Sequence, residues 1–260
     1  MEPLPFGPAQ TNSEILIETD QGMWVGGIAN PPEPSGITLF DVERGYWDLF
    51  RVGYEIIFGQ DELSCGTRAG DEWWFGTTDG IQIYIPESGS WVPISESRGL
   101  PDPRITAIAF DGNYVYVGTA AGMSRMSPVS KARVEWTLSQ EIQHLPIRTL
   151  HWDGKALWIS TDMGLLRWTA STDKVQFYGG SGDQTVELTP ISDISFALLK
   201  SPITAIVSSD SMVYFGDELG ILVYERGSGN WRRITGQSRL VGLQILTLEL
   251  SEGPGETDEL

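Results

Sequence analysis

Histidine and acidic side chains are the groups in this sequence that could carry acid–base chemistry or bind a metal. The two histidines, His144 and His151, flank an expected strand seven residues apart, with no cysteine or carboxylate at ligand spacing. A zinc site or a nucleophilic triad is therefore unsupported, and no phosphate-binding loop occurs. We expect no catalytic, cofactor-binding or metal-binding site. An enzyme, for instance a lyase or hydrolase, would have to use these histidines and nearby acids.

Four acidic residues are candidates for a ligand-binding face. They occupy equivalent turns of a repeated pattern: Asp79, Asp162, Asp217 and Glu218. The ordinary role of such residues is turn formation, because short acidic side chains hydrogen-bond to their own backbone. A ring of acids on one face could also bind a cation or an amine, so both interpretations stay open.

One segment resembles the Asp-box of sialidase-type propellers. Residues 160–168 read Ser-Thr-Asp-Met-Gly-Leu-Leu-Arg-Trp, but the tryptophan is one place late and the threonine of the motif is absent. The sequence also shows no convincing arginine cluster of the kind a sialidase uses. The segment is weak support for that activity.

A signature of four residues recurs five times and must position all of these side chains. An aromatic, an apolar, a small and a small polar residue follow each other, and the aromatics are spaced by 50, 42, 42 and 56 residues. The copies are Trp24-Val25-Gly26-Gly27, Trp74-Phe75-Gly76-Thr77, Tyr116-Val117-Gly118-Thr119, Trp158-Ile159-Ser160-Thr161 and Tyr214-Phe215-Gly216-Asp217. Self-similarity with a period of about 40–50 residues is typical of a propeller with one four-stranded sheet per repeat.

Short patterns around the signature predict the other three strands of each repeat. An apolar segment precedes the signature and reads Ile-Thr-Ala-Ile at 105–108 and 203–206. In the third and fourth repeats, an Asp-Gly turn lies between the apolar segment and the signature. After it come a glycine, an alternating strand and an aromatic strand. Stacked sheets of this kind bury both faces. We therefore expect a structural role for the signature residues Trp24, Trp74, Gly76, Tyr116, Gly118, Trp158, Ser160, Tyr214 and Gly216.

The predicted fold is all-β: a β-propeller of five recognisable four-stranded repeats plus one extra C-terminal strand of a sixth. We expect one domain over 1–260, with repeats at about 13–51, 60–97, 100–140, 142–180 and 201–236. The partial sixth repeat covers 240–250, and 179–200 is an insertion. The extra strand could close the ring by pairing near the N-terminus, or the chain could be a piece of a longer propeller.

Charge and composition exclude several classes of partner. The net charge of −18 argues against binding to nucleic acid and to anionic membrane surfaces. It fits either simple solubility or an acidic face for a cationic partner. The single cysteine, Cys65, excludes an internal disulfide. Neither a signal peptide nor a membrane-spanning segment is predicted, so we expect a cytoplasmic protein if the chain is complete and an extracytoplasmic one if it is an excised sensor domain.

The whole repeat resembles the two-component regulator propeller repeat. The resemblance rests on Leu-Pro, Ile-x-x-Ile, Asp-Gly, Trp-x-Gly-Thr, Gly-Ile/Leu and a final aromatic strand, most clearly at 100–136 and 145–178. It covers most of 11–250. It implies a sensor or ligand-binding propeller, in that family usually extracytoplasmic and often linked to a histidine kinase and a transcription regulator.

We therefore expect a non-enzymatic binding module without a cofactor. It would bind a glycan, a peptide or a protein partner on a loop face, with no nucleic acid and no membrane insertion. The alternative is a protein–protein scaffold subunit within a larger assembly, suggested by the incomplete sixth repeat, the insertion and the acidic charge. The propeller lyase or hydrolase is the least favoured of the three.

Overall fold

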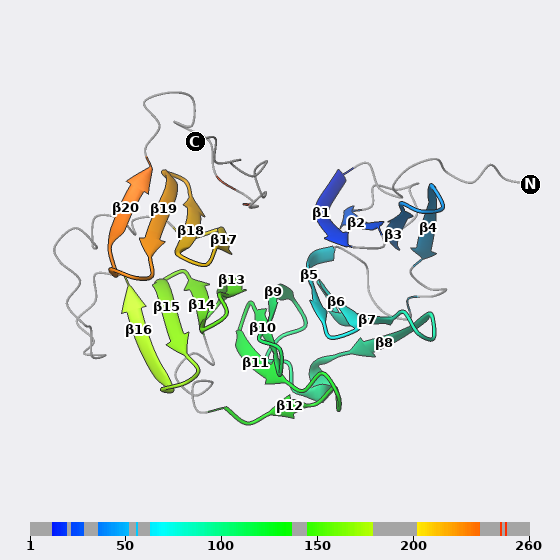
Figure 1. Ribbon diagram of the computed structural model, residues 1–260. Coiled ribbons are helices and arrows are strands. Elements are labelled where there is room, and N and C mark those ends of the chain that lie inside the picture. Colours follow the sequence, from blue (N-terminus) through cyan, green and yellow to red (C-terminus); the bar gives the residue numbers. More distant parts are fainter. Residues whose placement is uncertain are drawn as a thin grey trace, which may run out of the picture. The chain divides into compact units, whose positions relative to one another are not determined.

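The computed structural model describes residues 12–19, 22–28, 36–51, 56, 63–136, 145–178, 202–234, 245 and 248. These residues form five four-stranded antiparallel sheets and almost no helix, which confirms the predicted fold class (Figure 1). In every sheet the strands follow each other in chain order, so each repeat is a meander of four neighbouring strands. The chain divides into two compact units, Met1–Ile147 and Arg148–Leu260, each described by itself.

The first unit contains three sheets. The first sheet is β1 (Asn12–Thr19), β2 (Gly22–Ile28), β3 (Gly36–Asp41) and β4 (Tyr46–Arg51). The second sheet is β5 (Leu63–Ala69), β6 (Glu72–Thr77), β7 (Gly80–Ile85) and β8 (Ser90–Ile94), followed by the short turn η1 (Glu96–Arg98). The third sheet is β9 (Ile105–Phe110), β10 (Val115–Thr119), β11 (Gly122–Met126) and β12 (Arg133–Val134).

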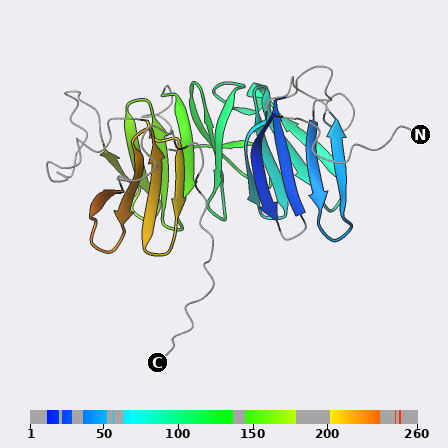
Figure 2. The same ribbon diagram turned by 90° about the horizontal axis from the view of Figure 1, so that it is seen from above.

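The second unit contains two sheets, and the boundary between the units falls at the first residue of β13. The fourth sheet is β13 (Ile147–Trp152), β14 (Ala156–Thr161), β15 (Gly164–Thr169) and β16 (Lys174–Tyr178). The fifth sheet is β17 (Ala205–Ser208), β18 (Met212–Asp217), β19 (Gly220–Glu225) and β20 (Trp231–Ile234). Within this unit the two sheets stand side by side with their strands running alongside one another (Figure 2).

Every signature aromatic lies on the second strand of its sheet. Trp24, Trp74, Tyr116 and Trp158 are buried, and Tyr214 is half-buried. For Trp24, Trp74 and Trp158 burial follows from stacking, because the neighbouring sheet of the same unit packs against the second strand. Two of the resulting cores are rich in aromatic rings, one around Trp24 between the first and second sheets and one around Trp158 between the fourth and fifth.

The small third residue of the signature receives the first isoleucine of the next repeat. A Cβ atom added to Gly76 would lie 2.5 Å from both Ile105 Cγ2 and the sulfur of Cys65. Ser64 closes the contact, because its hydroxyl donates to the carbonyl oxygen of Ile105 at 2.6 Å. Burial here raises the pKa of the Cys65 thiol to about 12, so this cysteine is a packing residue rather than a reactive one.

The same contact recurs at the end of the second unit and involves the sixth repeat. A Cβ atom on Gly216 would lie 2.5 Å from Ile245 Cγ2, and the Thr204 hydroxyl donates to the Ile245 carbonyl oxygen. Ile245 thus holds the position on the fifth sheet that Ile105 holds on the second. Apart from Ile245 and Leu248, the predicted strand 240–250 lies outside the described residues, as do the insertion 179–200 and His144. The single domain over 1–260 stays a prediction.

Candidate functional site

A cleft of about 410 Å³ opens between the first and second sheets, and we name it the first-unit cleft. Its lining residues come from strand ends and turns of both sheets: Thr19, Trp24, Leu39, Asp41, Glu43, Arg44, Asp48, Trp73, Tyr84 and Pro86. They lie at the end of the sheets where the first strand turns into the second and the third into the fourth. The cleft is therefore built from turns on a rigid sheet frame, which is where binding residues are commonly found.

The floor of the first-unit cleft is aromatic. Trp24 lies on β2, and its ring centroid is 5.2 Å from that of Tyr84 on β7 and 6.3 Å from that of Trp73 on β6. Leu39, the cross-strand partner of Trp24, adds an aliphatic surface on β3. Flat aromatic and aliphatic surfaces of this kind contribute contact area to a ligand without much loss of side-chain entropy.

The rim of the first-unit cleft is acidic. Three carboxylates, Asp41, Glu43 and Asp48, face one cation, Arg44, so the lining carries a formal charge of −3 + 1 = −2. Arg44 is held at the outside: its Nη1 donates to the Tyr46 hydroxyl at 3.0 Å, its Nε lies 3.6 Å from Asp41 Oδ2, and its side chain is 67% exposed. Within the described part of the chain, Asp48 and Glu43 form no hydrogen bond or ion pair.

The acidic rim affects the pKa of a tyrosine in the aromatic floor. Partial burial raises the pKa of the Tyr84 hydroxyl, and the negative charge of Asp48 raises it further. Both effects disfavour a second negative charge in this space. The cleft is thus electrostatically suited to a neutral or cationic group.

The second unit contains the structural equivalent of this space, but filled. Trp158 pairs with Arg167 across β14 and β15, just as Trp24 pairs with Leu39 across β2 and β3. The Arg167 guanidinium carbon lies 5.4 Å from the ring centroid of Trp158 and 5.8 Å from that of Tyr224. Arg167 Nη1 also donates to Gln176 Oε1 at 3.1 Å. A side chain of the protein itself therefore occupies the place that is open in the first unit.

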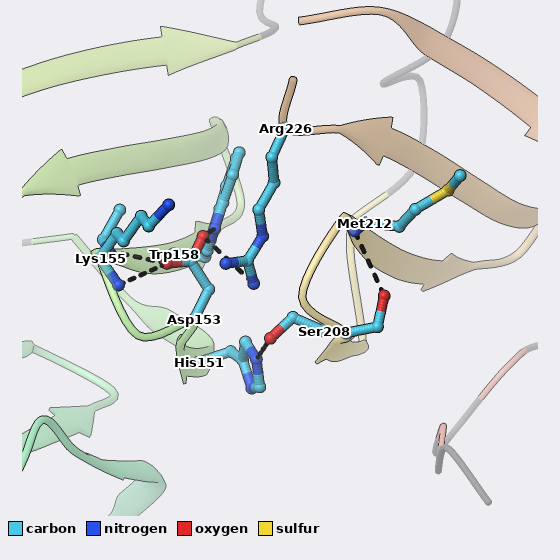
Figure 3. Close-up of polar contacts among 9 residues, drawn as sticks. His151, Asp153, Lys155, Trp158, Ser208, Met212 and Arg226 are labelled. Atoms are coloured by element: carbon cyan, nitrogen blue, oxygen red, sulfur yellow. Dashed lines mark hydrogen bonds and ion pairs between the residues drawn. The ribbon is translucent and has the colours of Figure 1, made fainter. Parts of the chain in front are cut away.

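A second part of this filling is the carboxylate of Asp153 (Figure 3). It accepts hydrogen bonds from Trp158 Nε1 at 2.8 Å and from the backbone N–H groups of Lys155 and Ala156, and Arg226 Nη2 lies 3.9 Å away. Burial alone would raise the pKa of Asp153, but these donors together outweigh it and hold the pKa below its usual range. Asp153 is thus an ionised structural anchor of its turn.

His151 is the histidine that the structure describes, and it bonds to a serine. Its Nε2 lies 2.8 Å from Ser208 Oγ, which joins β13 to β17 (Figure 3). Burial lowers the pKa of His151 to about 4, with Asp153 opposing and Arg226 adding to the shift. A neutral histidine beside a hydroxyl has the form of a base–nucleophile pair. However, such a low pKa makes a weak base, and the nearby Asp153 carboxylate is occupied by Trp158 and the backbone.

The four predicted ligand-face acids are not in the first-unit cleft. They lie where second strands turn into third strands, which in each sheet is the end opposite to the turns between the first and second strands. Asp217 is fully buried and forms two hydrogen bonds with Arg233, at 2.8 and 2.7 Å. Asp162 forms an exposed ion pair with Arg148, and Asp79 and Glu218 are exposed. In the ranges that the structure describes, no three histidine, cysteine or carboxylate groups come together to hold a metal ion.

Sequence reasoning missed the residues of the first-unit cleft. A signal was present in the register of the repeats: the position across from the signature aromatic is Arg125 in the third repeat and Arg167 in the fourth, but Leu39 in the first. The residue across from Leu39 is Asp48, where the fourth repeat has Gln176. The second and fifth repeats also have an aliphatic residue across from the aromatic, Ile83 and Val223, so the carboxylate of Asp48 is what marks the first repeat as different.

Comparison with known proteins supports the fold. No protein-family model matches the chain, and no curated protein matches it. Among solved structures, the chain is similar to the extracellular domain of BT4673 from B. thetaiotaomicron, which is named as a hybrid two-component system (TM-score 0.65, 18% identity, 91% of this chain). It is also similar to U3-55K (TM-score 0.63, 12% identity, 93% of this chain and 72% of that one). A third neighbour is the computationally designed Ika8 protein (TM-score 0.60, 17% identity, 94% of this chain and 67% of that one).

These similarities concern the fold, because all three identities are low. The chain spans 30% of the length of the BT4673 structure, so it corresponds to only part of that protein. An extracellular domain of a two-component system is among the proteins that share this architecture. No helix in the described ranges has the length and hydrophobicity needed to cross a membrane.

Proposed function

We propose that this protein is a non-enzymatic, sensor-type propeller module that binds its ligand in the first-unit cleft. The observation that carries the proposal is the contrast between the two equivalent spaces: Arg167 fills the one in the second unit, and Leu39 leaves the one in the first unit open. Core packing normally leaves few voids. An open, aromatic-floored cleft at one of two matching positions is therefore best explained by a ligand.

The chemistry of the cleft suits the ligand classes expected from the sequence. The half-buried ring of Tyr84 can pack against a sugar ring or a peptide side chain, while Asp48 and Glu43 can accept hydrogen bonds. A glycan, a peptide or a loop of a protein partner would meet these groups at the turns of the first and second sheets. In the second unit, the low pKa of His151 and the hydrogen bond from Trp158 to Asp153 fit a structural role better than catalysis.

Membership of the two-component regulator propeller family is part of this proposal. Its supports are the repeat motifs and the likeness in fold to the extracellular domain of BT4673. In such a protein the propeller senses a ligand outside the cytoplasm and passes the signal to a kinase and a transcription regulator. We infer the same division of labour for the longer protein to which this propeller would belong.

A screen of glycans and peptides against the intact chain tests the proposal. Leu39→Arg places a guanidinium where the fourth sheet has Arg167 and should close the cleft. Any ligand found should bind the wild type and Asp79→Asn alike, because Asp79 lies at the opposite end of the sheet, and should lose binding to Leu39→Arg. A ligand whose affinity is the same for Leu39→Arg would show that the cleft is not its site.

The scaffold alternative has one observation of its own in the second unit. Met163 and Leu219 occupy the same turn position in the fourth and fifth sheets and are 56% and 52% exposed. Large apolar side chains exposed at matching turns suit a protein partner. A double Met163→Ser, Leu219→Ser variant that loses a partner in co-purification, with ligand binding in the cleft unchanged, would favour this alternative.

A further inference from the structure

We propose that the first-unit cleft recognises an arginine side chain of a peptide ligand. The inference rests on the proposed function and names the ligand class of the same cleft. Its basis is that the second unit already contains an arginine side chain in an aromatic frame of nearly identical geometry.

The two aromatic frames share several ring pairs, although Trp73 of the first frame has Val213 in its place in the second. The Trp24–Tyr84 centroids are 5.2 Å apart at an interplanar angle of 67°, and the Trp158–Tyr224 centroids are 5.4 Å apart at 65°. The Trp24–Phe75 pair, at 5.1 Å and 62°, corresponds to Trp158–Phe215, at 5.0 Å and 69°. The two rings that Arg167 contacts in the second unit, Trp158 and Tyr224, thus have counterparts in the same arrangement in the first, where the Tyr84 ring is the half-buried one.

The tryptophan position of Trp91 extends the match. The Trp24–Trp91 centroids are 6.3 Å apart at 86°, and the Trp158–Trp231 centroids are 6.2 Å apart at 83°. Both outer tryptophans sit across from the tyrosine of the third strand. The likeness therefore includes the second, third and fourth strands of the sheets that form each frame.

What differs is the cation. In the second unit the Arg167 guanidinium lies over Trp158 and Tyr224. A related arrangement exists between the second and third sheets, where Lys131 Nζ lies 5.3 Å from the Trp74 ring centroid and contacts Glu72. Over Trp24, by contrast, none of the described arginine or lysine side chains is placed. Arg68 lies 5.8 Å from the ring centroid of the neighbouring Trp73, and Arg44 stands at the rim, but the place that Arg167 occupies over Trp158 and Tyr224 has no cationic counterpart over Trp24 and Tyr84 among the described residues.

The surroundings of the first-unit frame complement a positive charge. Leu39 stands where the fourth sheet has Arg167, and Pro86 stands where the fifth sheet has Arg226. Asp48 replaces the neutral Gln176 that binds Arg167, so the hydrogen-bond acceptor is kept and gains a charge. Compared with the second-unit space, the first-unit space thus lacks two arginines and has an additional carboxylate, which makes it acidic.

Arginine fits this cleft better than other cations do. A guanidinium is planar, so it can stack on the half-buried ring of Tyr84 while its edge donates to Asp48. An ammonium group lacks that plane and is more strongly hydrated. A peptide is the source we favour, because the open rim at Asp41 and Glu43 leaves room for a chain to continue out of the cleft.

Capped pentapeptides with one central residue between glycines provide the probe. Three peptides that carry arginine, citrulline or lysine, and free L-arginine, are titrated into the intact chain and followed by NMR. The arginine peptide should bind in the millimolar range or tighter, and citrulline should weaken binding about tenfold, the usual effect of losing a charge-assisted hydrogen bond. Lysine should bind less tightly than arginine, and free arginine less tightly than the capped peptide.

Variants locate the binding and separate this inference from the proposed function. Leu39→Arg should abolish binding, Asp48→Asn should weaken it about tenfold, and Asp79→Asn should leave it unchanged. If Leu39→Arg does not fold, Asp48→Asn decides.

Three results would overturn the inference: equal affinity for the citrulline and arginine peptides, no binding of the arginine peptide, or no effect of Asp48→Asn. Tighter binding of free arginine than of the capped peptide would overturn the assignment of a peptide as the ligand. If another ligand still depends on the cleft, the proposed function survives; if none does, both fall.

Discussion

The spaces around Trp24 and Trp158 have the same aromatic frame and opposite contents. The second unit fills its space with Arg167 and the bonded carboxylate of Asp153, whereas the first unit has Leu39, Thr19 and an open cleft in the corresponding places. The frame is thus the common structural element of the repeat, and what varies is the few side chains that project across it. The second-unit space is filled by side chains that add to stability, whereas the first-unit space is a cleft bordered by the half-buried Leu39 and Tyr84.

The largest expected effect compares the two tryptophans at their centres. Trp158→Ala should lower the free energy of unfolding by ~3–5 kcal/mol, because a fully buried ring, its hydrogen bond to Asp153 and its contact with Arg167 are all lost. Trp24→Ala should cost less, since Trp24 has no hydrogen bond among the described residues and borders the cleft. Urea denaturation of both variants measures the difference; equal losses would break the comparison.

Acid should act on the second unit through His151. The folded-state pKa, about 4, lies below the ordinary value of 6.5, so the unfolded chain binds more protons between these values. Stability should therefore be lost as pH falls from about 6.5 towards 4, by at most about 3 kcal/mol for a shift of this size.

The control for this prediction removes the titrating group and keeps a polar side chain. His151→Asn should flatten the pH dependence of the unfolding free energy across the same window. A variant whose stability still falls as steeply as the wild type would show that other groups dominate acid unfolding.

Opening the second-unit space should cost stability without destroying the frame. Arg167→Leu copies the first repeat and removes contacts with Trp158, Tyr224 and Gln176, so we expect a loss of about 1–3 kcal/mol in unfolding free energy. Near-ultraviolet circular dichroism should keep the aromatic signal. A variant as stable as the wild type would mean that Arg167 merely occupies space.

The smallest expected effect is in the first unit. Asp48→Asn should change the unfolding free energy by less than ~0.5 kcal/mol, because Asp48 forms no hydrogen bond or ion pair within the described residues. Its effect should be confined to ligand affinity. A large thermal shift in this variant would indicate that Asp48 is a structural residue and would weaken its assignment to the cleft.

The fold was accessible from sequence because repetition makes each strand visible several times. The Ile-Thr-Ala-Ile segments, the Asp-Gly turns and the aromatic signature each predict one strand, and the five sheets follow that order. The partial sixth repeat stays a prediction, although Ile245 contacts Gly216 as Ile105 contacts Gly76. These features are local, so they can be read from neighbouring letters.

The cleft was not accessible in the same way. The cleft exists because Leu39 and Pro86 do not fill the space that arginines fill in the second unit, and a missing side chain leaves no sequence motif. It also requires knowing that Asp48 faces Leu39 across β3 and β4, and that Tyr84 of the next sheet covers Trp24. The sequence instead predicted ligand-face residues from their charge and their equivalent turn positions: Asp79, Asp162, Asp217 and Glu218. In the structure, Asp217 pairs with Arg233.

The contact between successive repeats has a consequence for how such chains can be built. The Ser64 hydroxyl donates a hydrogen bond to the carbonyl oxygen of Ile105, and the Thr204 hydroxyl donates one to that of Ile245. In both cases the acceptor lies 41 residues further along the chain, and its isoleucine packs against a glycine. Each joint thus consists of a hydroxyl, a glycine and an isoleucine of the next repeat. A cassette of this length, cut at the hydroxyl residue, carries both halves of its own connector. Duplication or exchange of such cassettes could lengthen the array or replace one lined space with another while leaving the joints intact.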